Sequence, residues 1–335
     1  MKKEQKLSNR KILALLLALA LMLTFAAACG NSMDDTPGTV SAPVNIAALN
    51  GPTGMGMVKL MDMADKYNIT TYQAPTDIAP KLISGEVDVA TLPSNMAAVL
   101  YNKTQGQIVA VSPVVLGVLY VLGNDVELQD VKELKGKTIY ASGQGGTPEY
   151  VLQKVLETAG LDPQKDVTIK WLANHADVNQ KLLSEKGAIA MLPEPFVSTA
   201  LAAGGDSVKQ LFDLNELWNE ATGQELPMGV LVARRGFVSD RPADLEVLLK
   251  DYAESVDFVN SDDGAGALIV EKGFIGKEAI AKSAISRCKM VLFTGTNAGE
   301  GADILRTFNQ TLYDMEPASV GGVLPDEELY YTGAE

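Results

Sequence analysis

Two glycine-rich turns are the segments best suited to bind a small molecule. One spans residues 50–56 and follows the strand-like run 45–49; the other spans residues 143–148 and follows the run 138–142. In parallel α/β units, ligands lie beyond the carboxyl ends of the strands, where helices begin. Backbone N–H groups at a helix start attract anions and polar oxygens, and glycine lets a ligand approach them closely. The pattern predicts a site for a small polar or anionic molecule.

Two further helix starts, at residues 93–95 and 193–195, would complete this site. Thr147 precedes Pro148 and is expected to cap its helix. Glu194 occupies the position that Ser94 has in the other segment, and it either accepts a hydrogen bond from the ligand or caps its own helix. The candidate ligand-binding residues are Asn50, Gly51, Pro52, Thr53, Gly54, Met55, Ser94, Asn95, Gly143, Gln144, Gly145, Gly146, Thr147, His175 and Glu194.

Few residues could support catalysis or bind a metal ion. His175 is the one histidine of the chain, and a lone histidine is more often polar surface than a catalytic group. The chain has two cysteines, too few with one histidine for a transition-metal cluster. Residues 143–146 lack the glycine spacing and the acidic partner of a dinucleotide fingerprint. We therefore expect no metal, no cofactor and no enzymatic activity.

A repeated segment organises the chain. Residues 81–93 and 181–193 match in Lys, Leu, Ser, Ala, Leu and Pro at an offset of one hundred positions. Each copy is the end of a helix, a turn, a buried strand and a Leu-Pro pair that opens the next helix. With the glycine-rich turns upstream, strand, turn, helix, strand, helix, strand and helix occur twice. This predicts an α/β fold of two similar lobes that face each other across a cleft.

The chain is expected to cross between the lobes twice. The interpretation places residues 44–113 and 228–335 in the first lobe and residues 114–227 in the second, with crossings near Pro113 and Pro227. Two crossings make a two-stranded hinge. The helical stretches after residue 242 are expected to cover the first lobe, and residues 319–326 are expected to wrap across an existing surface.

The N-terminus indicates export. Residues 1–28 combine a basic segment with an apolar run of seventeen residues, which is typical of a signal peptide. Cys29 follows three alanines, an arrangement similar to the bacterial lipobox, whose cysteine is lipidated. Residues 29–43 are small and polar and are expected to form a flexible tether. The alternative is a plain secretory signal with an incidental cysteine. The protein is thus expected to be extracytoplasmic and lipid-anchored to the cell membrane through Cys29.

The net charge excludes some partners. The whole chain carries −14, and residues 29–335 carry −18, with 23 basic and 41 acidic side chains. Such a chain is repelled by nucleic acid and by anionic lipid. Nucleic acid is therefore not an expected partner.

The lipobox-like segment, the tether and several motifs together resemble the lipoproteins of ABC importers that have a periplasmic-binding-like fold. The motifs are residues 50–54, 133–139, 143–148, 192–196 and 319–326, and the resemblance is to the branch for nitrate, sulfonate, taurine and thiamine precursors. It implies a type II fold whose lobes close around one solute, with an ABC permease and its ATPase as partners; we expect a monomer. A small-molecule enzyme on the same fold, such as a dehydratase or pyrimidine synthase, is the main alternative, and a ligand-sensing module is another.

Overall fold

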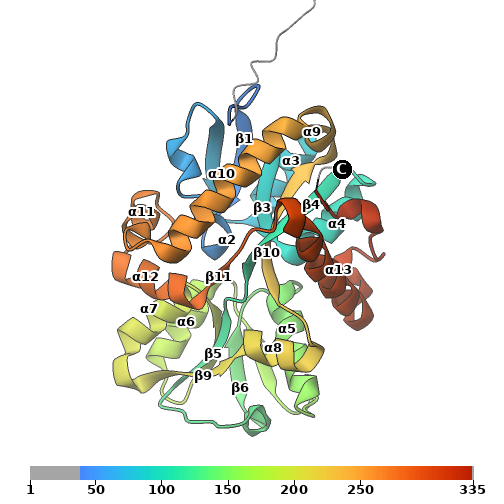
Figure 1. Ribbon diagram of the computed structural model, residues 1–335. Coiled ribbons are helices and arrows are strands. Elements are labelled where there is room, and N and C mark those ends of the chain that lie inside the picture. Colours follow the sequence, from blue (N-terminus) through green and yellow to red (C-terminus); the bar gives the residue numbers. More distant parts are fainter. Residues whose placement is uncertain (1–37, 334–335) are drawn as a thin grey trace, which may run out of the picture. The chain divides into compact units, whose positions relative to one another are not determined.

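The computed structural model describes residues 38–333, which form two β-sheets with helices packed against them (Figure 1). The six-stranded sheet has the strand order β11-β4-β10-β3-β1-β2, and the five-stranded sheet has the order β7-β6-β8-β5-β9. We call the parts built on these sheets the first and the second lobe. The strands are β1 Val44–Leu49, β2 Tyr67–Tyr72, β3 Val89–Pro93, β4 Ile108–Leu116, β5 Leu119–Asn124, β6 Thr138–Ala141, β7 Thr168–Trp171, β8 Ile189–Pro193, β9 Val208–Asp213, β10 Pro227–Arg234 and β11 Lys289–Met290.

Helices join the strands and cover both sheets. In the first lobe they are α2 Pro52–Met55, α3 Pro75–Ser84, α4 Ser94–Thr104, α9 Arg235–Asp240, α10 Pro242–Ser261, α11 Ala265–Glu271, α12 Glu278–Arg287 and α13 Ala298–Met315. In the second lobe they are α5 Thr147–Thr158, α6 His175–Ser184, α7 Phe196–Gly204 and α8 Leu214–Thr222. Short 3₁₀ turns are η1 Leu60–Asp62, η2 Val131–Leu134, η3 Gly205–Ser207, η4 Gly295–Asn297, η5 Pro317–Val320 and η6 Glu327–Leu329.

The predicted repeat is confirmed in the strand pairing. β1 pairs in parallel with β2 and β3, and β6 pairs in parallel with β7 and β8. One antiparallel strand then follows in each sheet, β10 beside β3 and β5 beside β8. The α3 and α6 helices begin one hundred positions apart, as do β3 and β8. The repeated strands therefore have the same order in both sheets, which is the predicted two-lobed α/β arrangement.

The outward crossing lies a few residues later than the sequence suggests. Pro113 is inside β4, which continues to Leu116 before β5 begins at Leu119. The pairing of β4 with β10 shifts register near Pro113, and such an irregularity admits a residue that has no N–H. The return runs through α8 to Pro227, where β10 begins.

The first copy departs from the helix that the repeat predicts after its glycine-rich turn. Only α2 and the 3₁₀ turn η1 form there, and Met57 and Leu60 are buried. Gly54 and Gly56 explain the difference, since glycine is a poor helix former. A side chain at Gly54 would also place its Cβ 2.3 Å from the Leu49 carbonyl oxygen.

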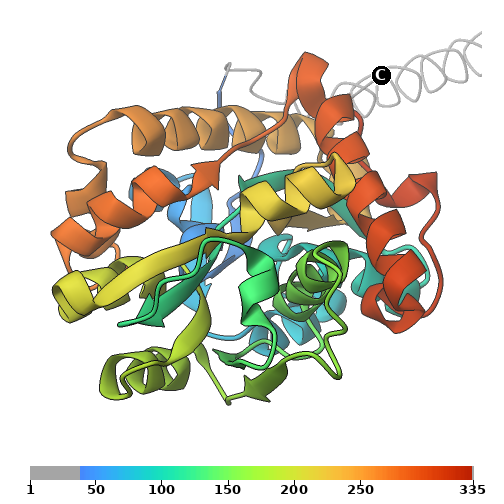
Figure 2. The same cartoon turned by 90° about the horizontal axis from the view of Figure 1, so that it is seen from below.

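The C-terminal helices cover the first lobe, and one of them also contacts the second. α10 and α13 pack on the first lobe, as expected (Figures 1 and 2). α12 packs against α7, and the hydroxyls of Ser283 and Ser198 form a hydrogen bond of 2.9 Å. The stretch after α13, which includes residues 319–326, lies against α4. The Asn102 side chain of α4 donates hydrogen bonds to the carbonyl oxygens of Val320 and Val323. The expected wrapping of this stretch is confirmed.

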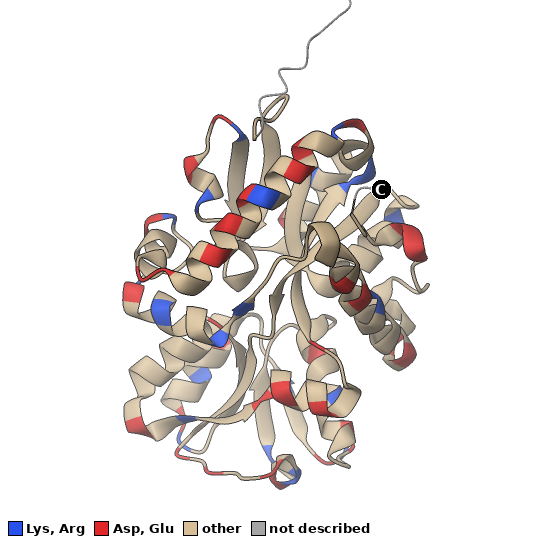
Figure 3. Ribbon diagram, in the orientation of Figure 1, with Lys and Arg blue, Asp and Glu red and all other residues tan. Residues whose placement is uncertain are grey.

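Charges are distributed over both lobes, with acidic positions along α10 and α13 (Figure 3). None of the helices within residues 38–333 combines the length and the apolar character that a membrane-spanning segment needs. The predicted signal peptide, Cys29 and residues 29–37 of the tether lie outside the described residues.

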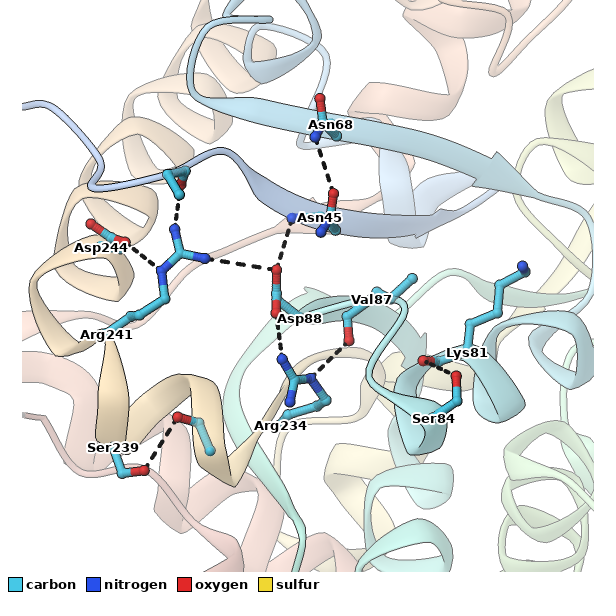
Figure 4. Close-up of polar contacts among 12 residues, drawn as sticks. Asn45, Asn68, Lys81, Ser84, Val87, Asp88, Arg234, Ser239, Arg241 and Asp244 are labelled. Carbon is cyan, nitrogen blue, oxygen red and sulfur yellow. Dashed lines mark hydrogen bonds and ion pairs between the residues drawn. The ribbon is translucent and has the colours of Figure 1, made fainter.

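A buried cluster of charges fixes the start of β3. Asp88 is 7% exposed, and its carboxylate accepts hydrogen bonds from the Asn45 N–H at 3.1 Å and from Arg234 Nη2 at 2.6 Å (Figure 4). Arg234 Nε also donates to the Val87 carbonyl oxygen. The Arg241 guanidinium lies 3.9 Å from the same carboxylate. Asp88 therefore holds β1, β3 and β10 together at one end of the first sheet.

Replacing Asp88 with alanine is expected to lower the free energy of unfolding by about 3 kcal/mol, because a partly buried arginine would lose its partner. Glu86→Ala is the matched control, since Glu86 pairs with Lys81 on the surface and water screens that pair. Urea unfolding of both variants measures the difference. Equal losses in the two variants would contradict the assigned role of Asp88.

Candidate functional site

Two polar side chains lie at the ends of neighbouring strands in the first lobe. Asn50 follows β1 and Ser94 follows β3, and these strands pair in parallel through Ile46 with Val89 and Ala47 with Ala90. The strands therefore end side by side. Asn50 Oδ1 and Ser94 Oγ are buried and have no hydrogen-bond partner within the described chain. A buried polar atom left unpaired costs about 1–3 kcal/mol, so two such atoms at the ends of adjacent strands make this end of the sheet a candidate ligand site.

The helix that begins at Ser94 is open at its start. Pro93 is the N-cap residue of α4, and no described side chain caps this helix. Ser94 itself is fully buried. The first N–H groups of a helix have no partner inside the helix, so this start can donate to an acceptor.

Glu194 holds the equivalent position in the second lobe, but its carboxylate is engaged. Its Oε2 accepts from the Ser198 N–H at 3.2 Å and its Oε1 from the Ser198 hydroxyl at 3.0 Å. Arg287 Nε lies 3.6 Å away. Burial raises the pKa of the Glu194 carboxyl, and the bonds from Ser198 and the charge of Arg287 oppose that change. The capping role is therefore observed, and a ligand contact stays a prediction.

The second glycine-rich turn differs from the expectation that its N–H groups are free. The Gly145 N–H donates to Glu149 Oε2 at 2.6 Å, and the Gly146 N–H donates to the Gly143 carbonyl oxygen at 3.1 Å. Gly143 and Gly145 have φ angles of +86° and +77°, which other residues rarely adopt. These glycines form the turn, and Gln144 between them is exposed.

Thr147 and Asn95 join the two lobes. Thr147 is the first residue of α5 and Gly146 is the N-cap, so the predicted capping role of Thr147 is wrong. Its hydroxyl instead donates to Asn95 Oδ1 at 3.3 Å. Both residues are buried, and the Asn95 amide group also donates to the Ser319 carbonyl oxygen at 3.1 Å. Helix starts from both lobes therefore meet, as the sequence predicts.

The remaining candidates of the first turn have structural roles. Gly51 has a φ of +88°, and Pro52 begins α2. Thr53 packs against β10, where a side chain at Gly229 would place its Cβ 2.7 Å from the Thr53 methyl group. Met55 is fully buried. With the close approach at Gly54, these contacts make the turn part of the core, so a substitution there tests the fold rather than binding.

His175 pairs with a residue that the sequence analysis missed. Ser142 Oγ and His175 Nδ1 lie 2.6 Å apart, and the imidazole packs against the Phe196 ring with centroids 5.6 Å apart. Burial lowers the pKa of His175 to about 4, so the ring is neutral at neutral pH. Ser142 directly follows β6, and this place at a strand end was the signal that could have identified it.

Three hollows lie elsewhere on the described surface. One of about 470 Å³ lies between α6 and α7, one of about 370 Å³ lies beside α3 and Arg234, and one of about 750 Å³ lies beside the crossing strands. None of the predicted site residues lines these three hollows. Within residues 38–333, no group of three histidine, cysteine or acidic side chains could hold a metal ion.

The family model of the NMT1-like family matches residues 59–271 of the chain, which is well over half of its length. This chain belongs to the NMT1-like family. A curated relative, the binding protein YtlA of Bacillus subtilis (strain 168), is 31% identical over 125 residues. That match covers 35% of this chain and 36% of the relative, so the aligned region is about a third of each protein.

Solved structures of other proteins share the fold. The crystal structure of an ABC transporter from Parabacteroides distasonis has a TM-score of 0.73 and 23% sequence identity, and the match covers 87% of this chain and 99% of that one. The periplasmic aliphatic sulphonate binding protein SsuA of Escherichia coli has a TM-score of 0.67 and 18% sequence identity. That match covers 86% of this chain and 92% of SsuA. The periplasmic nitrate-binding protein NrtA of Synechocystis PCC 6803 has a TM-score of 0.63 and 10% sequence identity. That match covers 84% of this chain and 85% of NrtA. The predicted two-lobed periplasmic-binding fold is confirmed.

The lowered pKa of His175 predicts a pH-dependent stability. His175 has a pKa of about 4 in the folded protein, against 6.5 in the unfolded chain. The contribution of His175 to the free energy of unfolding is therefore complete above pH 6.5 and is lost as the pH falls toward 4. Between pH 7 and pH 5 the wild type should lose about 1–2 kcal/mol more than a His175→Gln variant. Urea unfolding of both proteins at both pH values measures this difference. If the wild type and the variant lost the same free energy of unfolding, the imidazole would be exposed to water and not buried.

Proposed function

We propose that this chain is the extracytoplasmic solute-binding lipoprotein of an ABC importer. It captures a small polar or anionic organic solute, such as a sulfonate, nitrate or a thiamine precursor, and delivers it to a membrane permease. The observation that carries the proposal is the unpaired pair Asn50 Oδ1 and Ser94 Oγ at the start of α4. Membership of the NMT1-like family and the fold shared with SsuA and NrtA support it.

The solute would be held between the lobes. The bond between Thr147 and Asn95 joins helix starts of the two lobes next to Ser94, so a solute at Ser94 would contact residues of both. The lobe bounds stay close to the predicted ones, residues 44–113 with 228–335 and residues 114–227, but the chain leaves the first lobe after β4 ends at Leu116 and re-enters it where β10 begins at Pro227, and we propose these two crossings as the hinge. Closure of one lobe on the other would then report the loaded state to the permease.

An enzyme on the same fold is the alternative, and the Ser142–His175 pair is the observation that would favour it. A nucleophile needs an adjacent base and access to substrate. The His175 imidazole is adjacent at 2.6 Å, but Ser142 is only 2% exposed, so a substrate has no access to its hydroxyl. The pair fits a structural bond at the strand end better than a catalytic dyad, so we propose that no substrate is converted.

Thermal unfolding tests the capture of a solute. Methanesulfonate, taurine, nitrate and a hydroxymethylpyrimidine are each added to the purified protein, and the recovered compound is analysed. A solute at one hundred times its dissociation constant adds about 2.7 kcal/mol, which raises the melting temperature by several degrees. We expect at least one compound to do so and to be recovered unchanged. Conversion of the compound would favour the enzyme, and the absence of any shift would refute the proposed solute classes.

The proposed anchor rests on Cys29, and a Cys29→Ser variant tests it. Without a thiol to receive lipid, the variant should lose membrane association, whereas a Cys288→Ser control should retain it. Cell fractionation followed by mass spectrometry of the N-terminus measures the outcome. A Cys29→Ser protein that still partitions with membranes and carries lipid would disprove anchoring through this residue.

A further inference from the structure

The helix starts of the two lobes differ in whether their hydrogen-bonding groups already have partners within the chain. The α4 helix, with Ser94 as its first residue, has no side-chain cap within the described chain. The α7 helix is closed by Glu194, whose carboxylate accepts from Ser198. The turn before α5 is closed as well, because Glu149 accepts the Gly145 N–H at 2.6 Å. Of these three starts, α4 is the one at which a fully buried hydroxyl, Ser94 Oγ, is also unpaired.

The groups around this open start include both donors and acceptors. The first N–H groups of α4 can only donate, and the Ser94 hydroxyl can do either. Asn50 Oδ1, at the neighbouring strand end, can only accept. A molecule that satisfies all of them must offer an acceptor to α4 and, beside it, an N–H or O–H to Asn50.

Charge at the site is unfavourable for an anion. The predicted site residues include no lysine or arginine. The nearest arginine to Glu194, Arg287, is 3.6 Å from that carboxylate and also donates to the Gln210 side chain. The turn N–H that would attract an anion is occupied by the carboxylate of Glu149. Burial lowers the pKa of His175, which keeps that ring uncharged.

We propose that the solute is uncharged and carries a hydrogen-bond acceptor next to an N–H or O–H donor, as an amide, a sulfonamide or a nitrogen heterocycle does. The acceptor binds Ser94 and the start of α4, and the donor binds Asn50 Oδ1. This inference rests on the proposed function, and it narrows the solute from the polar or anionic classes to one class. Sulfonate and nitrate have only acceptors and would leave Asn50 Oδ1 unpaired.

Three probes of nearly the same shape separate charge from hydrogen bonding. Methanesulfonamide is uncharged with donor and acceptor, dimethyl sulfone is uncharged with acceptors only, and methanesulfonate is an anion with acceptors only. Calorimetry at about 10 mM probe is suited to fragments of this size. We expect methanesulfonamide to bind at least about tenfold more tightly than either of the others, which corresponds to one hydrogen bond.

Variants tie the probe to the site. Ser94→Ala and Asn50→Ala should each weaken methanesulfonamide binding by about tenfold while the protein stays folded, because neither oxygen has a partner to lose. Ser255→Ala is the matched control: Ser255 is equally buried in the first lobe, and its oxygen accepts from the Lys59 N–H at 3.1 Å. This control should lose stability and keep affinity.

The outcomes separate this inference from the proposed function. Tighter binding of methanesulfonate than of methanesulfonamide would overturn the inference and leave solute capture standing. Equal binding of methanesulfonamide and dimethyl sulfone would overturn the donor requirement. Methanesulfonamide binding that survives both Ser94→Ala and Asn50→Ala would move the site elsewhere. A folded protein that binds none of these probes would overturn the inference, and if it also bound no compound of the solute screen, the proposed function would fail with it.

Discussion

The parallel pairing of β1 with β3 is the constraint on which the candidate site depends. It sets Ala47 opposite Ala90, so the two strands end together and their next residues, Asn50 and Ser94, become neighbours. Thr91 Oγ1 accepts the Leu49 N–H at 2.9 Å, which fixes the two ends to each other. A slip of one residue would turn every side chain of β3 to the opposite face, and Thr91 could no longer make this bond. The hydrophobic core and the site therefore require the same register.

The repeat shows which features belong to the fold and which to binding. Both lobes share strand order, helix placement and the Leu-Pro pair that begins a helix, so these features serve packing. The copies differ where Ser94 is replaced by Glu194. A carboxylate there caps its own helix and binds Ser198, whereas a serine leaves the helix start open. An architecture used twice thus has one closed and one open position, and under the proposed function the open one, at α4, would be the helix start that receives the solute.

The sequence predicted the two lobes, the repeat and the meeting of helix starts, because alternation of apolar residues and glycine turns follows from local rules. It placed the first crossing near Pro113, since it could not show that an irregular pairing would keep this residue within β4, which continues to Leu116. It also expected free N–H groups at Gly145 and Gly146. The carboxylate of Glu149 reaches back over one helical turn to Gly145, a contact that depends on the exact path of the turn. Ser142 was missed because its partner, His175, comes from another strand end.

The two ends of β3 differ in how their polar groups are satisfied, and this difference links stability to binding. At its start, the Asp88 carboxylate is bonded to the Asn45 N–H and to Arg234, so that end is complete without a ligand. At its other end, Ser94 Oγ and Asn50 Oδ1 are buried and unpaired within the described chain. Two buried atoms without a partner lower the stability of the folded state. A solute that binds both oxygens restores the missing bonds and stabilises the folded state by mass action. Under the proposed function, the bonds of Asp88 would stabilise the strand with or without a solute, and the unpaired oxygens at its other end would contribute to the affinity for the solute.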